Sequence, residues 1–135
     1  MKFIQLRIIV MLAALSLSGY AQAEAEFEKA YLQIMNDSNW AQVAEYQVRQ
    51  LLEGKTLNEA QQLLLKQKQC LSLAQENRFY EFVNARLPEY QSYMRNQGFT
   101  KLYSAQKITQ EGSAVQAKYL VLRQELQMTD YPCEQ

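Results

Sequence analysis

Apolar residues recur every three or four positions along most of the chain, the spacing that places them on one face of an α-helix. The longest Gly- and Pro-free segment after residue 23 ends at Leu87, just before Pro88. Thr56 and Glu59 have the spacing of a capping box, so the pattern predicts a central helix over residues 56–87. Its apolar stripe comprises Leu57, Ala60, Leu64, Leu71, Ala74 and Phe82, with Leu63 and Cys70 beside it.

Two polar residues, Gln67 and Arg78, fall within this apolar stripe. A lone Arg buried in a core costs several kcal/mol, because its charge loses water without gaining a partner. The pattern therefore predicts either a bend near residues 75–77 or an exposed edge at these two positions; the alternative is that both polar side chains lie in the core with partners.

Two shorter helices are predicted before the central one, over residues 24–35 and 39–53. The four residues Asn36-Asp37-Ser38-Asn39 lie between them and are typical of turns and helix starts. Gly54 is placed to end the second helix in the left-handed conformation that Gly adopts at low cost.

Further helices are predicted after the central one. Pro88 suits the first turn of a helix that reaches about residue 97 and stops at Gly98. Another helix covers residues 100–110, and Gly112 and Ser113 separate it from a last helix that ends near residue 128. If Gly112 is tolerated within a helix, these last two become one. Strand-like alternation is nearly absent, so we predict an all-α protein, a small bundle of four to six helices.

The N-terminal residues have the pattern of a secretory signal peptide. Lys2 and Arg7 precede an apolar segment over residues 8–17, and Ala21-Gln22-Ala23 supplies small residues at a cleavage site. We predict a signal peptide over residues 1–23, cleaved after Ala23, and one helical domain over residues 24–135; the alternative is an uncleaved anchor. The expected location is the periplasm of a bacterium or the medium outside the cell.

The charge balance excludes one class of function. The chain has 14 basic and 14 acidic residues, and removal of Lys2 and Arg7 leaves 12 basic against 14 acidic. Without a basic excess there is no electrostatic attraction for phosphate backbones, so nucleic-acid binding is not expected. No later segment approaches 18 consecutive apolar residues, so no integral membrane segment is expected after cleavage.

The two cysteines, Cys70 and Cys133, predict one disulfide in an oxidising compartment. It would link the central helix to the C-terminal tail. An intermolecular bridge through Cys133, or two free thiols, are the alternatives at this point.

The chain contains no histidine. This excludes Ser-His-Asp and Cys-His catalysis in their usual form, and zinc or haem bound through His. Gly-rich phosphate loops are also absent, and no pair of carboxylates has a spacing that distinguishes it. We therefore expect no catalytic residues, no cofactor and no metal, and predict that the protein is not an enzyme.

Aromatic and cationic residues concentrate between residues 78 and 103, which hold 7 of the 13 aromatic residues after residue 23. Tyr and Arg dominate binding energy at many protein interfaces. In the alternative interpretation, Phe79, Phe82 and Phe99 belong to the core and the tyrosines line its rim. The first interpretation predicts a partner-binding surface formed by Arg78, Tyr80, Arg86, Tyr90, Tyr93, Arg95 and Tyr103.

These observations favour a non-enzymatic binding protein of the bacterial envelope, for example an inhibitor or immunity-type protein that contacts another envelope protein. One alternative is a structural or chaperone-like helical module, and a second is a small-molecule carrier. Either a monomer or a homodimer is compatible with the sequence.

Overall fold

The computed structural model describes the backbone of residues 2–133 and the side chains of residues 19–133. This part of the chain forms four helices and no strand. The all-α class and the predicted number of helices are confirmed. The helices are α1 (Lys2–Leu52), α2 (Glu59–Ala85), α3 (Leu87–Asn96) and α4 (Ala105–Leu126).

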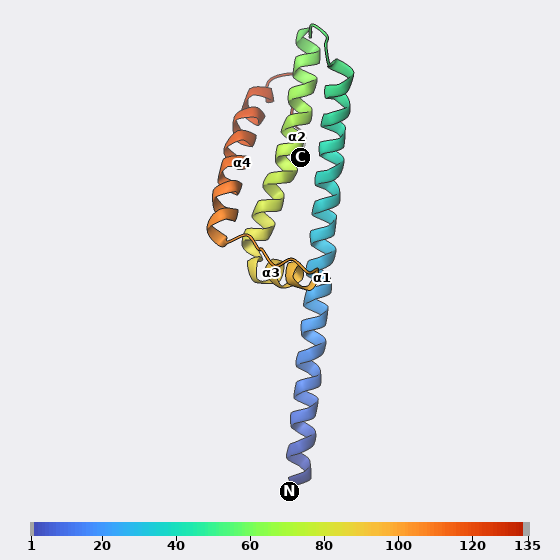
Figure 1. The fold of residues 1–135 in the computed structure, drawn as a ribbon, viewed down its shortest axis with the longest axis vertical. Helices are drawn as coiled ribbons and strands as arrows, with labels where there is room; N and C mark the ends of the chain where they lie inside the picture. The colour runs from blue at the N-terminus through green and yellow to red at the C-terminus, as the bar shows by residue number, and fades with distance from the viewer. Residues whose placement is uncertain (1, 134–135) are drawn as a thin grey trace.

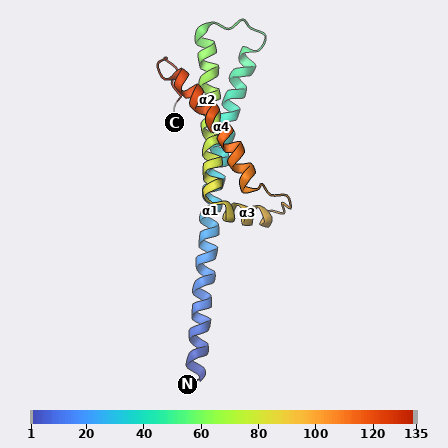
Figure 2. The same ribbon diagram turned by 90° about the vertical axis from the view of Figure 1, so that its left-hand side faces the viewer.

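The helix α2 lies in the middle of the molecule, with α1 on one side and α4 on the other (Figure 1). Figure 2 shows that α4 crosses α2 obliquely, while the short α3 lies across the end of α2. The N-terminal half of α1 extends past α3, away from the other helices. Because α2 has neighbours on both sides, it needs apolar residues on two opposite faces.

Two separate hydrophobic clusters meet this need. At the α3 end of the molecule, Phe27 and Tyr31 of α1 pack with Val83, Tyr90 and Ile108. Further along α2, the second cluster joins this helix to α4 and the C-terminal tail. Its buried members are Cys70, Tyr119 and Leu126, and Leu63, Leu73, Ala74, Leu122 and Cys133 pack against them.

The central helix is continuous, and the predicted bend near residues 75–77 is wrong. The alternative, an exposed edge, holds for Arg78, which is exposed and pairs with Asp37 of α1 at 3.1 Å. Gln67 donates a hydrogen bond to the backbone oxygen of Pro132 at 2.8 Å. Both polar side chains therefore have partners without a break in the helix.

The start of this helix also differs from the prediction. The capping box is formed by Asn58 and Gln61 rather than by Thr56 and Glu59. The Asn58 side chain accepts from the Gln61 backbone N–H at 2.9 Å, and the Gln61 side chain accepts from the Asn58 backbone N–H at 3.1 Å. Asn serves the N-cap position as well as Thr does, so the same local chemistry acts two residues later.

The predicted break at residues 36–39 is wrong, because α1 runs through it. Gln33 donates to Asp37 at 2.8 Å and Gln42 donates to Ser38 at 3.5 Å, both at the four-residue spacing of one helix face. Asp37 is also held by Arg78 of α2. The short polar side chains thus bond to helix neighbours and to α2 instead of capping a new helix.

The predicted break at Gly112 and Ser113 is likewise wrong, and the alternative of a single merged helix is confirmed. The helix α4 begins after Ser104, whose hydroxyl accepts from the Lys107 backbone N–H at 3.2 Å. Residues 100–104 lie outside it. Gly112 is therefore a helix-interior glycine, at a point where α4 approaches Tyr80 of α2.

The helix ends marked by Gly and Pro are as predicted. Gly54 and Gly98 have φ values of 72° and 88°, the left-handed conformation, directly after α1 and α3. Pro88 lies in the first turn of α3. In the described part of the chain, no helix is long and apolar enough to cross a membrane.

The predicted disulfide between Cys70 and Cys133 is confirmed as an intramolecular bond, with 5.7 Å between the two Cα atoms. Cys70 is fully buried in α2. The bond therefore fixes the C-terminal tail against the side of α2 that faces α4.

Candidate partner-binding surface

The aromatic residues of segment 78–103 form, in large part, the core where α1, α2 and α3 meet. Tyr31 of α1 lies 5.2 Å from Tyr93 and 6.0 Å from Tyr90 between ring centroids, and Phe27 lies 5.3 Å from Phe82. These separations are typical of favourable aromatic pairs. The cluster fixes α3 against the two long helices.

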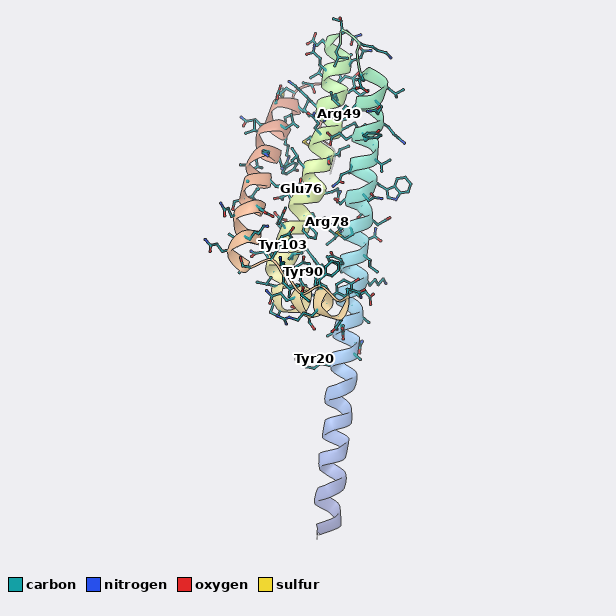
Figure 3. All side chains as sticks on the ribbon, in the orientation of Figure 1. Tyr20, Arg49, Glu76, Arg78, Tyr90 and Tyr103 are labelled. Carbon is teal, nitrogen blue, oxygen red and sulfur yellow. A yellow bond between two sulfur atoms is a disulfide. The ribbon has the colours of Figure 1, made fainter. Side chains whose placement is uncertain are left out.

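Tyr90 is only 4% exposed. Figure 3 places it at the junction of α1, α2 and α3. Burial raises the pKa of Tyr90, and the nearby Tyr103 raises it further. Burial also raises the pKa of Tyr31, and the nearby Tyr90 and Tyr93 raise it further. These tyrosines are therefore built into the interior rather than presented to a partner.

Arg86 belongs to the same structural unit. Its guanidinium lies 5.1 Å from the ring centroid of Phe27 and 5.6 Å from that of Phe82. It also donates to the Glu89 carboxylate at 3.3 Å. A cation over two aromatic faces, with a carboxylate beside it, stabilises the start of α3.

Tyr80 connects α2 to α4. Its hydroxyl donates to the Glu111 carboxylate at 3.0 Å, and its Cβ lies against Gly112. Burial, followed by this hydrogen bond and the charge of Glu111, raises the pKa of Tyr80 to about 12. Arg78 occupies the other side of α2, where it pairs with Asp37.

Two members of the predicted surface, Arg95 and Tyr103, are exposed. They flank the connection between α3 and α4, which also carries Phe99, exposed at 54%, and Lys101. Tyr103 is 43% exposed, and the Nζ atom of Lys107 lies 4.4 Å from its ring centroid. We name this group the α3–α4 loop surface: Arg95, Phe99, Lys101, Tyr103 and Lys107.

The seven predicted residues thus separate into two groups. Five of them, Arg78, Tyr80, Arg86, Tyr90 and Tyr93, have partners within the fold, and Arg95 and Tyr103 lie on the α3–α4 loop surface. Phe99, which the alternative interpretation places in the core, lies on the surface instead. Its position directly after Gly98, in a loop rather than a helix, is the sequence signal that distinguishes it from Phe79 and Phe82.

Two hollows border α2. One is a cleft of about 130 Å³ against α4, where Thr109 donates to Asn84 at 3.4 Å and Asn77 donates to Glu81 at 2.9 Å. Its volume is below the roughly 300 Å³ at which small-molecule pockets begin. The other, of about 680 Å³, is an open groove between α1 and α2 beside Phe82. Among the described residues, no cluster of three or more metal-ligating side chains occurs.

Comparison of the chain with protein-family models, with curated proteins and with solved structures yields no match.

Proposed function

We propose that the protein is an exported, non-enzymatic binding protein that contacts another protein of the bacterial envelope through the α3–α4 loop surface. The observation that carries this proposal is the exposure of two aromatic rings, Phe99 and Tyr103, in one loop. Lys101 lies between them in the sequence, and Arg95 and Lys107 lie before and after them. Aromatic side chains between cations are suited to a partner with an acidic rim around an apolar centre. An inhibitor or immunity-type protein that blocks an envelope enzyme is one concrete form.

The framework around this loop supports a role in binding. The aromatic cluster holds α3 on one side, and the Ser104 cap begins α4 on the other. Between them the chain turns at Gly98 in the left-handed conformation. A loop fixed at both ends loses less conformational entropy when it binds, which favours affinity.

Export is supported by two features. The Cys70–Cys133 disulfide belongs to an oxidising compartment. The N-terminal residues carry Lys2, Arg7, an apolar segment and the Ala21-Gln22-Ala23 pattern of a signal peptide.

The proposal is tested by capture from envelope extract with the immobilised protein. The variant Phe99→Ala/Lys101→Glu/Tyr103→Ala changes three exposed side chains of the loop surface, and we expect it to lose at least tenfold in capture of a specific partner. A matched control, Leu120→Ala/Lys118→Glu, changes exposed residues of α4 outside the loop. Capture by the parent protein should also weaken as salt concentration rises, because the loop cations would be screened.

Equal capture by the loop variant and the parent protein would contradict this surface. Equal loss in the loop variant and the α4 control would contradict it as well, since the effect would then not be specific to the loop. The variants are compared only after circular dichroism shows that both retain the helix content of the parent.

A further inference from the structure

The side of α1 that faces away from α2 carries a row of large apolar side chains. We name it the outer face of α1 and define it by Leu32, Met35, Trp40, Val43, Tyr46 and Leu51. All of these except Val43 are exposed, and Trp40 is 66% exposed. At 100° per residue, Leu32, Trp40, Val43 and Leu51 lie opposite the buried side of α1, which carries Phe27, Tyr31, Ile34 and Ser38, and Met35 and Tyr46 lie between these two sides.

The outer face also lacks charge. Of the 12 exposed residues between Leu32 and Leu51, Arg49 is the only charged one. Arg49 lies five helical turns after Tyr31, in the same direction around α1 and outside the outer face, and pairs with Glu45 at 2.6 Å. By contrast, the exposed residues of α4 include Lys107, Lys118, Arg123 and Glu125. A helix surface that only contacts water normally carries charges, as α4 does, whereas the other exposed residues of this part of α1 are large apolar side chains interspersed with uncharged Asn and Gln.

We infer that the outer face of α1 binds the same face of a second copy of this chain, with the two α1 helices antiparallel. An uncharged face meets its own copy without repulsion, whereas a charged partner would lose its hydration there without gaining an ion pair. In an antiparallel pair, the partial positive charge at the N-terminus of each helix lies beside the partial negative charge at the C-terminus of the other, which is favourable.

The positions of the large side chains fit a twofold axis beside Ala41 and Gln42. About this axis, Leu32 of one copy lies at the level of Leu51 of the other, and Trp40 lies at the level of Val43. On the other edge of the face, Met35 lies two residues, about 3 Å, from the level of Tyr46. The large Trp40 side chain therefore meets the smaller Val43, and the thioether of Met35 meets an aromatic ring, a favourable contact.

The size of the face fits a dimer that forms as the protein concentration rises. From Leu32 to Leu51 it is about 29 Å long at the rise of an α-helix. Aromatic side chains bury about 150–250 Å² each when fully covered, and Trp40 and Tyr46 are 66% and 61% exposed in the single chain. With the aliphatic side chains, the pair removes at most about 1,200 Å² from water, the lower end of the range of specific interfaces. The surface is separate from the α3–α4 loop surface, so the dimer does not depend on the proposed function.

The experiment uses protein purified from cells that express the 135-residue chain. We expect sedimentation equilibrium to show a mass that doubles as concentration rises. Trp40 is the only Trp of the chain, so its emission reports on this face directly. The emission should shift to shorter wavelength, and iodide quenching should fall, over the same concentration range in which the mass doubles.

The variant Leu32→Glu/Leu51→Glu places carboxylates opposite one another at both ends of the dimer. We expect it to remain a monomer with a red-shifted, fully quenched Trp40 emission at every concentration. The control Leu120→Glu/Val121→Glu adds the same charges at exposed apolar positions of α4 and should dimerise as the parent does.

The antiparallel arrangement is tested by adding single cysteines. Asn36 lies at the level of Gln47 of the other copy, so a mixture of Asn36→Cys and Gln47→Cys proteins should form a crosslinked dimer under mild oxidation. Each variant alone should crosslink poorly. Efficient crosslinking of Asn36→Cys with itself would overturn the antiparallel arrangement.

A mass that stays monomeric at every concentration would overturn the dimer. The proposal also fails if Trp40 shifts only when anionic phospholipid vesicles are added, because the outer face would then bind a lipid surface.

Discussion

Gly112 of α4 lies directly against the side chain of Tyr80 of α2. A Cβ atom placed on Gly112 would be 2.9 Å from the Tyr80 Cβ and 3.4 Å from its Cγ. Both Tyr80 atoms are close to the backbone and have little freedom to move. The hydroxyl of the same tyrosine donates to Glu111, the residue before Gly112. The close approach of the two helices thus depends on one missing side chain.

This contact predicts that Gly112→Ala destabilises the protein, although Ala favours a helix over Gly by about 1 kcal/mol. The added methyl group has to push α4 away from α2, and such overpacking costs about 1–3 kcal/mol. We expect a net loss in the free energy of unfolding of about 1 kcal/mol, measured by urea denaturation. Ser113→Ala, at the next and exposed position, should have little effect. A Gly112→Ala variant more stable than the parent would contradict the close packing.

The raised pKa of Tyr80 predicts a loss of stability in alkali. In the folded protein Tyr80 keeps its proton up to a pH of about 12, whereas an unperturbed tyrosine loses it near pH 10. Between pH 10 and 12 the unfolded state therefore binds fewer protons than the folded state. The free energy of unfolding falls as pH rises through this window, and Tyr80 adds no pH dependence below it.

The variant Tyr80→Phe tests this assignment. We expect its stability to fall less steeply above pH 10 than that of the parent, measured by urea denaturation at fixed pH values. At neutral pH it should lose about 1 kcal/mol through the missing hydrogen bond to Glu111. Tyr46→Phe changes an exposed tyrosine and serves as the control. If the parent and Tyr80→Phe have the same slope above pH 10, Tyr80 is not the group responsible.

Features that depend on a few neighbouring residues could be predicted from the sequence. The helix ends at Gly54 and Gly98, and the position of Pro88 in α3, follow from backbone preferences that act locally. The disulfide could be predicted because the chain offers only one pair of cysteines.

Features that depend on contacts between helices could not be predicted from the sequence. Asp37 has the sequence signal of a helix start, but its contacts with Gln33 and Arg78 hold it within α1. Gly112 has the signal of a break, but the approach of Tyr80 accounts for it inside α4. In both cases one partner lies on α2, far away in the sequence: Arg78 for Asp37 and Tyr80 for Gly112.

Which aromatic residues are buried and which are exposed also depends on the arrangement of the helices. A single stripe on the central helix does not reveal that α2 packs on two opposite sides, with Phe82 towards α1 and Cys70 towards α4. Nor does spacing alone show that Tyr90 is buried while Phe99 is exposed. Of the residues predicted for the partner-binding surface across segment 78–103, only Arg95 and Tyr103, near its end, lie on the α3–α4 loop surface.

The disulfide predicts a large difference in stability between the oxidised and reduced protein. It closes a loop with a sequence separation of 63 residues, for which the chain-entropy model gives at most about 4 kcal/mol. We expect Cys133→Ser to lower the free energy of unfolding by about 2–4 kcal/mol, measured by denaturation with and without a reductant. Cys70→Ser should cost more, because Cys70 is fully buried and its hydroxyl would have to find a partner in the core. Reduction without loss of stability would contradict this role.

Replacing either of two glutamines of α2 by Leu should change the stability of the protein in opposite directions. Gln75 has a buried side-chain oxygen with no hydrogen-bond partner among the described residues, which costs about 1–3 kcal/mol. Gln67 instead donates to the Pro132 backbone and so holds the C-terminal tail. We therefore expect Gln75→Leu to raise the free energy of unfolding by about 1 kcal/mol and Gln67→Leu to lower it by a similar amount. Urea denaturation of both variants under oxidising conditions measures the difference, and a Gln75→Leu protein less stable than the parent would show that its amide has a partner, such as a bound water, in solution.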